Sequence, residues 1–254
     1  MNSAKVNSRS KFGLKRSVLM TAALSASLFI VGCSSNDNAV SGSVSNLAEF
    51  EIVVTNLSAS QPMSPIALAM HNPDWTSFTT GEPASLALEN LAEGGDNSTY
   101  LAAADASNNV FHSESGNGAI SPGASETLTV QVNQSDLGTL SFSVLSMLVN
   151  TNDAVVAINN QSIASISLNE TLGFNALSYD SGTEANTETA DTMPGPAAAG
   201  GAQEGFNAVR DDVRDAVYVH AGVVTQSDGL ASSVLSAEHR WDHPVFRVTV
   251  ERTQ

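Results

Sequence analysis

Short β-type runs separated by turn signals fill most of this 254-residue sequence and limit the folds it can adopt. The run FEIVVTNL at 50–57 is rich in β-branched residues and alternates as a strand does. The longest apolar run, GTLSFSVLSMLVNTND at 138–153, predicts a central strand buried on both faces. The closing run HPVFRVTVER at 243–252 alternates clearly. Because many short strands with regularly spaced turns favour stacked sheets, we expect an all-β fold, an antiparallel β-sandwich.

One stretch departs from this pattern. EPASLALENLAEGGD at 82–96 predicts a single short helix, with Pro83 in its first turn and Gly94 and Gly95 at its end. By contrast, MPGPAAAGGAQEG at 193–205 is rich in Pro, Gly and Ala and predicts a long irregular connection. The sandwich is therefore expected to carry one short helix and long polar loops.

The amino-terminal residues predict export. A basic start and a short apolar run make residues 1–32 a signal peptide, because the run is shorter than the roughly 20 apolar residues of a spanning helix. Its end, IVGC, resembles the bacterial lipobox, in which the cysteine becomes the acylated first residue. We therefore expect lipidation at Cys33; the alternative is a secreted protein with a cysteine near its cleavage point. Ser34 and Ser35 favour an outer-membrane lipoprotein that faces the periplasm or the cell surface.

The remaining sequence divides into a tether and a domain. Residues 33–47 are small and polar, as flexible linkers are, and residues 48–254 are long enough for one domain with its own core. Cys33 is the only cysteine, so the domain has no disulfide. Its stability must come from the core, with or without a metal.

Charge narrows the classes of partner. Residues 1–32 hold five of the ten Lys and Arg and none of the 26 Asp and Glu, so the rest has a net charge of −21 and no Lys. Such a chain repels nucleic acid and anionic headgroups, so we expect no nucleic-acid partner. The large negative charge of this part of the chain favours solubility in salt, cation binding, or both.

Acidic residues gather in the stretch SYDSGTEANTE at 178–188 and just beyond it. Asp180, Glu184, Glu188 and Asp191 lie there without a Lys or Arg between them. This composition fits two interpretations, a solvated acidic loop or a site for a hard cation.

A second acidic residue, Asp153, ends the long apolar run. If the strands before Asp153 and Asp180 run in the same direction, both loops meet at one end of the sandwich, where Asp153, Asp180 and Glu184 can converge. Calcium takes six to eight oxygen ligands at roughly 2.3–2.6 Å, and carboxylates without nearby thiolates suit it better than softer metals. The spacing is not that of an EF-hand loop. Further oxygens are available from Asn152, Asn159, Thr183 and Asn186.

Catalytic alternatives have less support. His239 and His243 are four residues apart, but Pro244 follows at once and no glutamate completes a zinc-protease motif. A structural turn with Trp241 buried is the other interpretation. His220 fits a core histidine, and no Gly-x-Ser-x-Gly elbow occurs. A hydrolase of the cell envelope, acting through carboxylates or histidines, is the second hypothesis; the first is that the protein is not an enzyme.

Several of these segments together resemble the spondin domain, the amino-terminal domain of F-spondin- and mindin-type matrix proteins that also occurs in bacterial secreted proteins. The segments are SMLVNTNDAVVAIN, LSYDSGTEANTE followed by MPGP, and HRWDHPVFRVTVER, and the similarity covers roughly 49–252. Asp153 matches the final Asp of the motif S-M-[IL]-V-x-[ST]-x-D. Asp180 and Glu184 match the first and last acids of D-[AS]-G-T-[DE].

The resemblance implies an eight-stranded antiparallel β-sandwich with one bound calcium ion, Ca2+, held by Asp153, Asp180 and Glu184. Animal members have Trp where this chain has Ala154, and they carry disulfides. The combined expectation is a lipid-anchored, non-catalytic module outside the cytoplasm. It would mediate adhesion or matrix and surface interaction by binding an unknown surface protein or polysaccharide.

Overall fold

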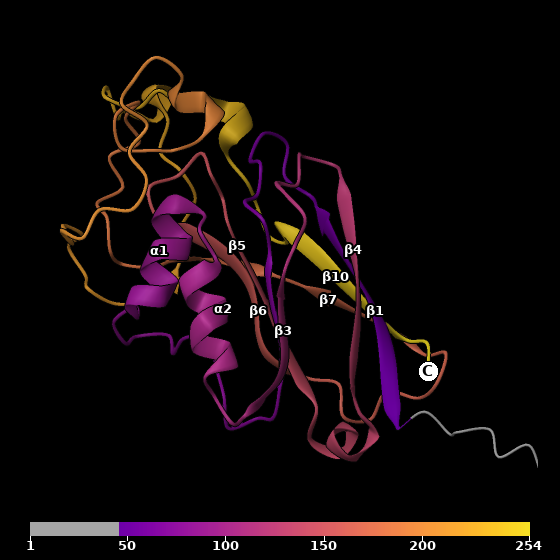
Figure 1. Ribbon diagram of the computed structural model, residues 1–254. Helices are drawn as coiled ribbons and strands as arrows, with labels where there is room; N and C mark the ends of the chain where they lie inside the picture. Colours follow the sequence, from indigo (N-terminus) through magenta and orange to yellow (C-terminus); the bar gives the residue numbers. More distant parts are fainter. Residues whose placement is uncertain (1–45) are drawn as a thin grey trace, which may run out of the picture. The chain divides into compact units, whose positions relative to one another are not determined.

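The structure is a computed structural model that describes residues 46–254 (Figure 1). The predicted signal peptide 1–32, Cys33 and nearly all of the predicted tether 33–47 lie outside these residues. Among the described residues, no helix is both long and apolar enough to cross a bilayer.

The described chain is mostly β and forms two sheets in which all neighbouring strands are antiparallel. The first sheet has the order β4 (Ser125–Asn133), β1 (Leu47–Asn56), β10 (Phe246–Arg252), β7 (Thr171–Asn175). The second has the order β3 (Val110–Ser115), β2 (Ala67–His71), β5 (Ser141–Met147), β6 (Ala154–Ser162), β8 (Leu177–Asp180), β9 (Tyr218–Val219). Figure 1 shows β1, β4 and β10 on one side of the domain and β5 and β6 on the other.

One hydrophobic core joins the two sheets. Phe50, Ile52 and Val54 alternate along β1 and are fully buried, and they belong to the same cluster as Phe142 and Val156 of the second sheet. This alternation follows from the two-residue repeat of a strand, which sends every second side chain to the same face. The antiparallel arrangement of two sheets around a shared core is confirmed, and it is loosely that of a sandwich.

The second sheet is covered on its other face by two helices, α1 (Leu86–Gly94) and α2 (Ser98–Asp105). Leu88 and Leu91 of α1 and Tyr100 of α2 cluster with Leu145 and Val155 of the sheet. Every residue of β5 is therefore buried, as the long apolar run predicts. Ser85 caps α1 through a hydrogen bond from the Leu88 backbone N–H to its hydroxyl, and Gly95 ends it in a left-handed conformation with φ 67°.

Two expectations about the elements need correction. The sequence predicts one helix, but a second, Ala-rich helix follows at once because Asp96 and Asn97 allow a new start after Gly95. The apolar run DAVYVHAGVV at 215–224 also predicts a full strand, but only Tyr218 and Val219 pair with β8. Ten strands are assigned in the described residues, rather than eight. Short 3-10 helices complete the elements: η1 (Gln134–Thr139), η2 (Pro196–Ala198), η3 (Gln226–Asp228), η4 (Ala237–His239).

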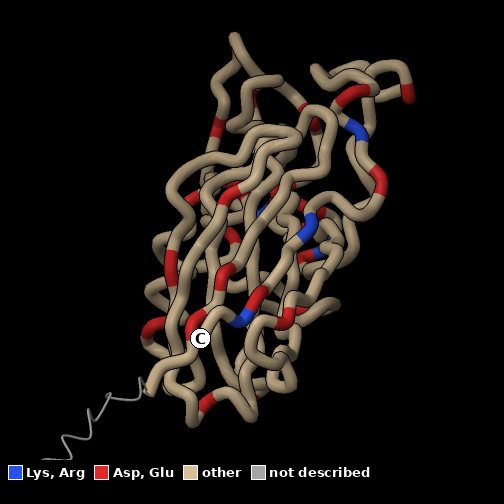
Figure 2. Tube along the Cα trace, turned by 90° about the vertical axis from the view of Figure 1, so that its right-hand side faces the viewer, with Lys and Arg blue, Asp and Glu red and all other residues tan. Residues whose placement is uncertain are grey.

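Acidic residues are spread over the whole described domain, whereas Arg residues are few (Figure 2). The chain between β8 and β10, residues 181–245, is mostly irregular and packs around a small apolar cluster of Met193, Ala198, Val223 and Leu235. This region holds most of the candidate site.

Candidate functional site

Asp153 and Asp180 lie side by side at the same end of the second sheet. Asp180 is paired with Ala154 across β6 and β8, and the backbone N–H of Ser181 donates to the Asp153 carbonyl at 3.3 Å. Because β5 and β8 both run antiparallel to β6, they run in the same direction, which is the condition under which the two loops meet. Asp153 is 0 % exposed and Asp180 is 1 % exposed. The structure therefore brings these two predicted residues together.

Asp153 organises the loop that contains Glu184. Its Oδ2 atom accepts hydrogen bonds from the Ser181 hydroxyl at 2.8 Å, the Thr183 backbone N–H at 2.8 Å and the Glu184 backbone N–H at 3.1 Å. Its Oδ1 atom is buried and has no hydrogen-bond partner among the described residues. Burial and the neighbouring Asp180 carboxylate raise the pKa of Asp153 to about 7.

Asp180 closes a tight turn on itself. Its Oδ1 atom accepts from the Gly182 backbone N–H at 2.9 Å, and its Oδ2 atom accepts from the Asn186 side-chain amide at 2.7 Å. Gly182 has φ 71°, and a Cβ there would lie 2.3 Å from the Ala216 carbonyl oxygen. The glycine of the DSGTE motif is therefore required both for its left-handed backbone and for close packing.

Glu184 is buried in the same loop, with 7 % of its surface exposed. Its Oε2 atom has no hydrogen-bond partner among the described residues. Burial, followed by the charges of Glu93 and Asp153, raises its pKa to about 8. The three residues of the predicted metal site thus form one buried acidic group.

Glu93 joins this group, and the sequence reasoning missed it. It lies on the last turn of α1, is 0 % exposed, and accepts a hydrogen bond from the Asn207 backbone N–H at 2.8 Å through Oε2. Its Oε1 atom has no hydrogen-bond partner among the described residues. Burial is the main cause that raises the pKa of Glu93. The sequence signal that could have identified Glu93 is its place near the carboxyl end of the predicted helix, where the helix dipole disfavours a negative charge.

The interpretation of a solvated acidic loop is wrong for three of its four acids. Asp180, Glu184 and Glu188 are buried, whereas Asp191 is exposed. Glu188 accepts a hydrogen bond from the Val224 backbone N–H at 2.7 Å, and burial raises its pKa to about 7. It therefore ties the acidic loop to the segment that follows β9.

The other predicted oxygen donors divide into two groups. Asn186 and Thr183 contact Asp180 and Asp153, and Asn152 accepts from the Glu188 backbone N–H at 3.1 Å. Asn159 lies farther along β6 and accepts from the Ser77 backbone N–H instead, so it is not part of the site.

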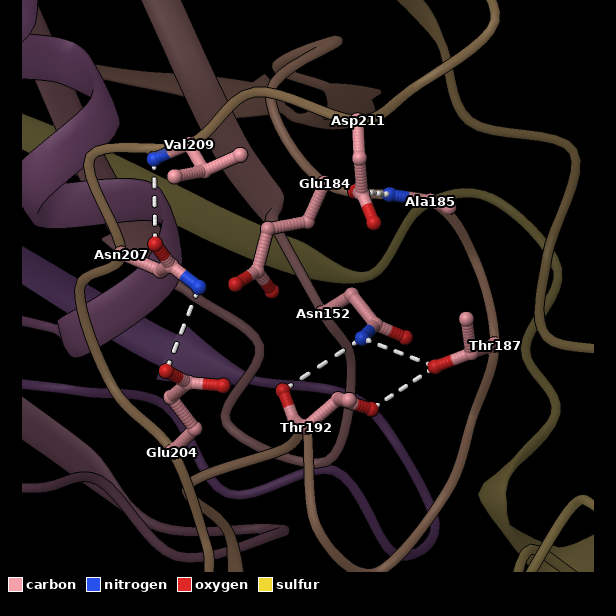
Figure 3. A pocket seen from close by; sticks show the side chains of 9 residues that line it. All are labelled: Asn152, Glu184, Ala185, Thr187, Thr192, Glu204, Asn207, Val209 and Asp211. Atoms are coloured by element: carbon pink, nitrogen blue, oxygen red, sulfur yellow. Dashed lines mark hydrogen bonds between the residues drawn. The ribbon is translucent and has the colours of Figure 1, made fainter.

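A polar cavity of about 90 Å³ opens beside Glu184 (Figure 3). Its walls come from the acidic loop and from the segment that precedes β9. Figure 3 shows the Glu184 carboxylate pointing into the space between Asn207, Asn152 and Glu204. The lining residues are Asn152, Glu184, Ala185, Thr187, Thr192, Glu204, Asn207, Val209 and Asp211.

Two of the histidines considered as catalytic candidates, His239 and His220, contact neighbouring loop residues, and His220 Nε2 lies 3.9 Å from Asp180 Oδ2. His239 ends the 3-10 helix η4 and its Nδ1 atom bonds to Ser236, so His239 and His243 do not share a helical face. His220 is buried, accepts from the Gly222 backbone N–H through Nδ1, and packs on Trp241 with ring centroids 5.2 Å apart. Trp241 is only partly buried, and its indole N–H donates to Ser178 at 3.0 Å.

The donor chemistry of the acidic group fits a hard cation. Asp153 Oδ1 and Glu184 Oε2 are buried oxygens without hydrogen-bond partners in residues 46–254, and such atoms cost stability unless something donates to them or binds them. In residues 46–254, no three or more His, Cys, Asp or Glu side chains are placed to hold a metal ion by themselves. Calcium also takes carbonyl and amide oxygens as ligands.

Comparison with known proteins adds no family to this description. No family model matches the chain, and no curated protein matches it significantly. The resemblance to the spondin domain therefore stays a prediction from the residues quoted above.

Proposed function

We propose that this protein is a non-catalytic, calcium-binding module of the spondin type, built on the antiparallel two-sheet fold described above. It is attached to the outer membrane through lipid on Cys33, faces the periplasm or the cell surface, and mediates adhesion or matrix and surface interaction. The observation that carries this proposal is the group of buried carboxylates at one end of the sheet, where one oxygen of Asp153 and one of Glu184 have no hydrogen-bond partner in the part of the chain that the structure describes.

Asp153, Asp180 and Glu184 are the residues that would hold Ca2+. When bound, the ion supplies positive charge to carboxylates that repel one another, and so it ties the loop after β5 to the loop after β8. The acidic group has no arginine of its own: Arg210 pairs with Glu89 and with Asp215 at the edge of the region. Binding to the folded state alone stabilises it by mass action.

The proposed adhesion role follows from the proposal that this is a non-catalytic protein outside the cytoplasm. A non-catalytic module outside the cytoplasm needs a partner, and the strongly negative surface disfavours nucleic acid and anionic lipid as that partner. A surface protein or polysaccharide is the remaining class, and calcium-ordered loops at one end of the sheets would form the binding surface.

The test is affinity capture from envelope extracts by immobilised wild-type protein, in calcium and in chelator. The matched variants are Asp180→Asn, at the proposed site, and Glu51→Gln, an exposed acid on β1 of the other sheet. We expect specific capture in calcium by the wild type and Glu51→Gln, and loss of it in chelator or with Asp180→Asn. Identical capture under all conditions would show that partner binding does not depend on calcium. No specific capture would contradict the adhesion role and indicate a purely structural protein.

A further inference from the structure

The polar cavity beside Glu184 has a closed end and an open end. Asn152 and Glu184, at its inner end, are 1 % and 7 % exposed, whereas Glu204, Val209 and Asp211 are exposed to solvent. Figure 3 shows the Glu184 carboxylate directed into the cavity, with no dashed line to any neighbour. A ligand group that enters from solvent would therefore reach a buried carboxylate.

Several side-chain hydrogen-bond donors around the cavity bond to other residues of its walls. The Asn152 amide N–H group donates to Thr187 and to the Thr192 carbonyl, and that of Asn207 donates to Glu204 Oε1. The hydroxyls of Thr187 and Thr192 bond to each other at 2.8 Å. What faces the cavity is thus an excess of acceptors.

Three carboxylates supply these acceptors, and each has at least one oxygen without a hydrogen bond in the described residues. Oε2 of Glu184 is buried without a partner, Glu204 uses only Oε1, and Asp211 uses only Oδ1, which accepts from the Ala185 backbone N–H at 2.8 Å. No Lys, Arg or His lines the cavity. A group with several donors and a positive charge is the complement of such a wall.

The arrangement favours an ammonium group over a second metal ion. Glu184 lies at the inner end of the cavity and Glu204 and Asp211 lie at its mouth, so the carboxylates surround the cavity rather than converge on one point. A primary ammonium has three N–H donors that can reach oxygens in different directions. It is also compact enough for about 90 Å³, and Val209 offers an apolar wall to the methylene chain behind it.

We infer that this cavity binds a primary ammonium group at the end of a flexible or sugar-borne arm, as on a lysine side chain or an amino sugar. This inference rests on the proposed function, because it names the chemical group through which a surface partner would be recognised. Glu184 can serve both the proposed calcium ion and the cavity, since a carboxylate has two oxygens and about four lone-pair positions.

The test is calorimetric titration of the full chain with n-hexylammonium, and with n-hexanol as the uncharged control of equal length. Glu204→Gln removes one charge at the mouth, and Glu238→Gln removes one from an exposed acid outside the cavity lining. We expect saturable binding of hexylammonium only, weakened about tenfold by Glu204→Gln and unchanged by Glu238→Gln, since a hydrogen bond to a charged group contributes roughly that factor. Titrations with Nα-acetyl-lysine methylamide and with glucosamine distinguish the two sources.

Equal binding of hexanol, equal binding by both variants, or no saturation would each overturn the inference. The last outcome would mean that the cavity holds water only. Running each titration in calcium and in chelator separates this proposal from the previous one. If hexylammonium binds but calcium leaves the melting temperature unchanged, only the calcium proposal is contradicted. If calcium raises the melting temperature but hexylammonium does not bind, only the ammonium pocket is contradicted.

Discussion

The core between the sheets and the acidic end of the second sheet are buried to a similar degree by different means. Between the sheets, Phe50, Phe142 and Val248 are fully buried among apolar neighbours, and area removed from water stabilises them. At the acidic end, Asp153 and Glu93 are fully buried and accept hydrogen bonds from loop backbone, and the Glu184 carboxylate is buried beside them with one oxygen that has no partner among the described residues. Burial thus stabilises the first region by itself, whereas the second region needs a charge partner to gain from it.

The largest effect should come from the core. Phe142→Ala removes a buried ring that packs edge-on against Phe174, with ring centroids 5.3 Å apart. We expect a loss of about 3–5 kcal/mol in the free energy of unfolding, with the same value in calcium and in chelator. Urea denaturation under both conditions measures it. A loss that depends on calcium would contradict the separation of the two regions.

A smaller effect is expected at the acidic end, and it should depend on calcium. Asp180→Asn keeps an oxygen for the Gly182 N–H but removes the charge. Calcium at about 100 times its Kd should add about 2.7 kcal/mol to the free energy of unfolding of the wild type, and the variant should lack this gain. The melting temperature of Asp180→Asn in calcium should therefore equal that of the wild type in chelator. Glu51→Gln, on the other sheet, should keep the wild-type response. A full calcium response in Asp180→Asn would contradict the assignment.

The buried carboxylate of Glu188 should make the free energy of unfolding depend on pH, unlike the apolar core between the sheets. Its pKa is raised to about 7 from an ordinary value of 4.5, so between these values the folded state keeps a proton that the unfolded state releases. Its contribution to stability is therefore complete below about pH 4.5 and is lost as pH rises through about 7. In chelator, the free energy of unfolding of the wild type should fall across this range more steeply than that of Glu188→Gln. Equal slopes in urea denaturation at pH 5, 6 and 7 would refute this.

The smallest effect is expected at an exposed ion pair. Arg240 contacts Asp228 at 3.1 Å, and the Arg240 side chain is 54 % exposed. Arg240→Ala should change the free energy of unfolding by less than about 1 kcal/mol, because solvent screens such pairs. A thermal melt in low and high salt checks this, and a large loss would show that the irregular loops depend on surface pairs.

The sequence was most informative where one residue pattern decides the structure. The alternation of β1 and β10, the double burial of β5 and the helix α1 follow from the period of apolar residues. The meeting of Asp153 and Asp180 was expected only if their strands run in the same direction, and the structure supplies that condition.

What the sequence could not give depends on tertiary contacts. Glu93 reaches the acidic group only because α1 packs on the outer face of the second sheet, and the segment around Asn207 folds back over it. The same packing buries the acidic loop at 178–188, for which the sequence composition alone also allows a solvated conformation. The short β9 replaces a predicted strand because the backbone beyond Val219 bonds to side chains such as His220 and Glu188 instead of a ladder.

In the proposed site, Asp153, Asp180 and Glu184 share one calcium ion. Isothermal titration of calcium into chelator-treated protein measures this binding, with Asp180→Asn and Glu51→Gln beside the wild type. We expect one bound calcium per chain for the wild type and Glu51→Gln, and none at comparable affinity for Asp180→Asn. Absence of heat in the wild type, or equal binding by Asp180→Asn, would contradict it.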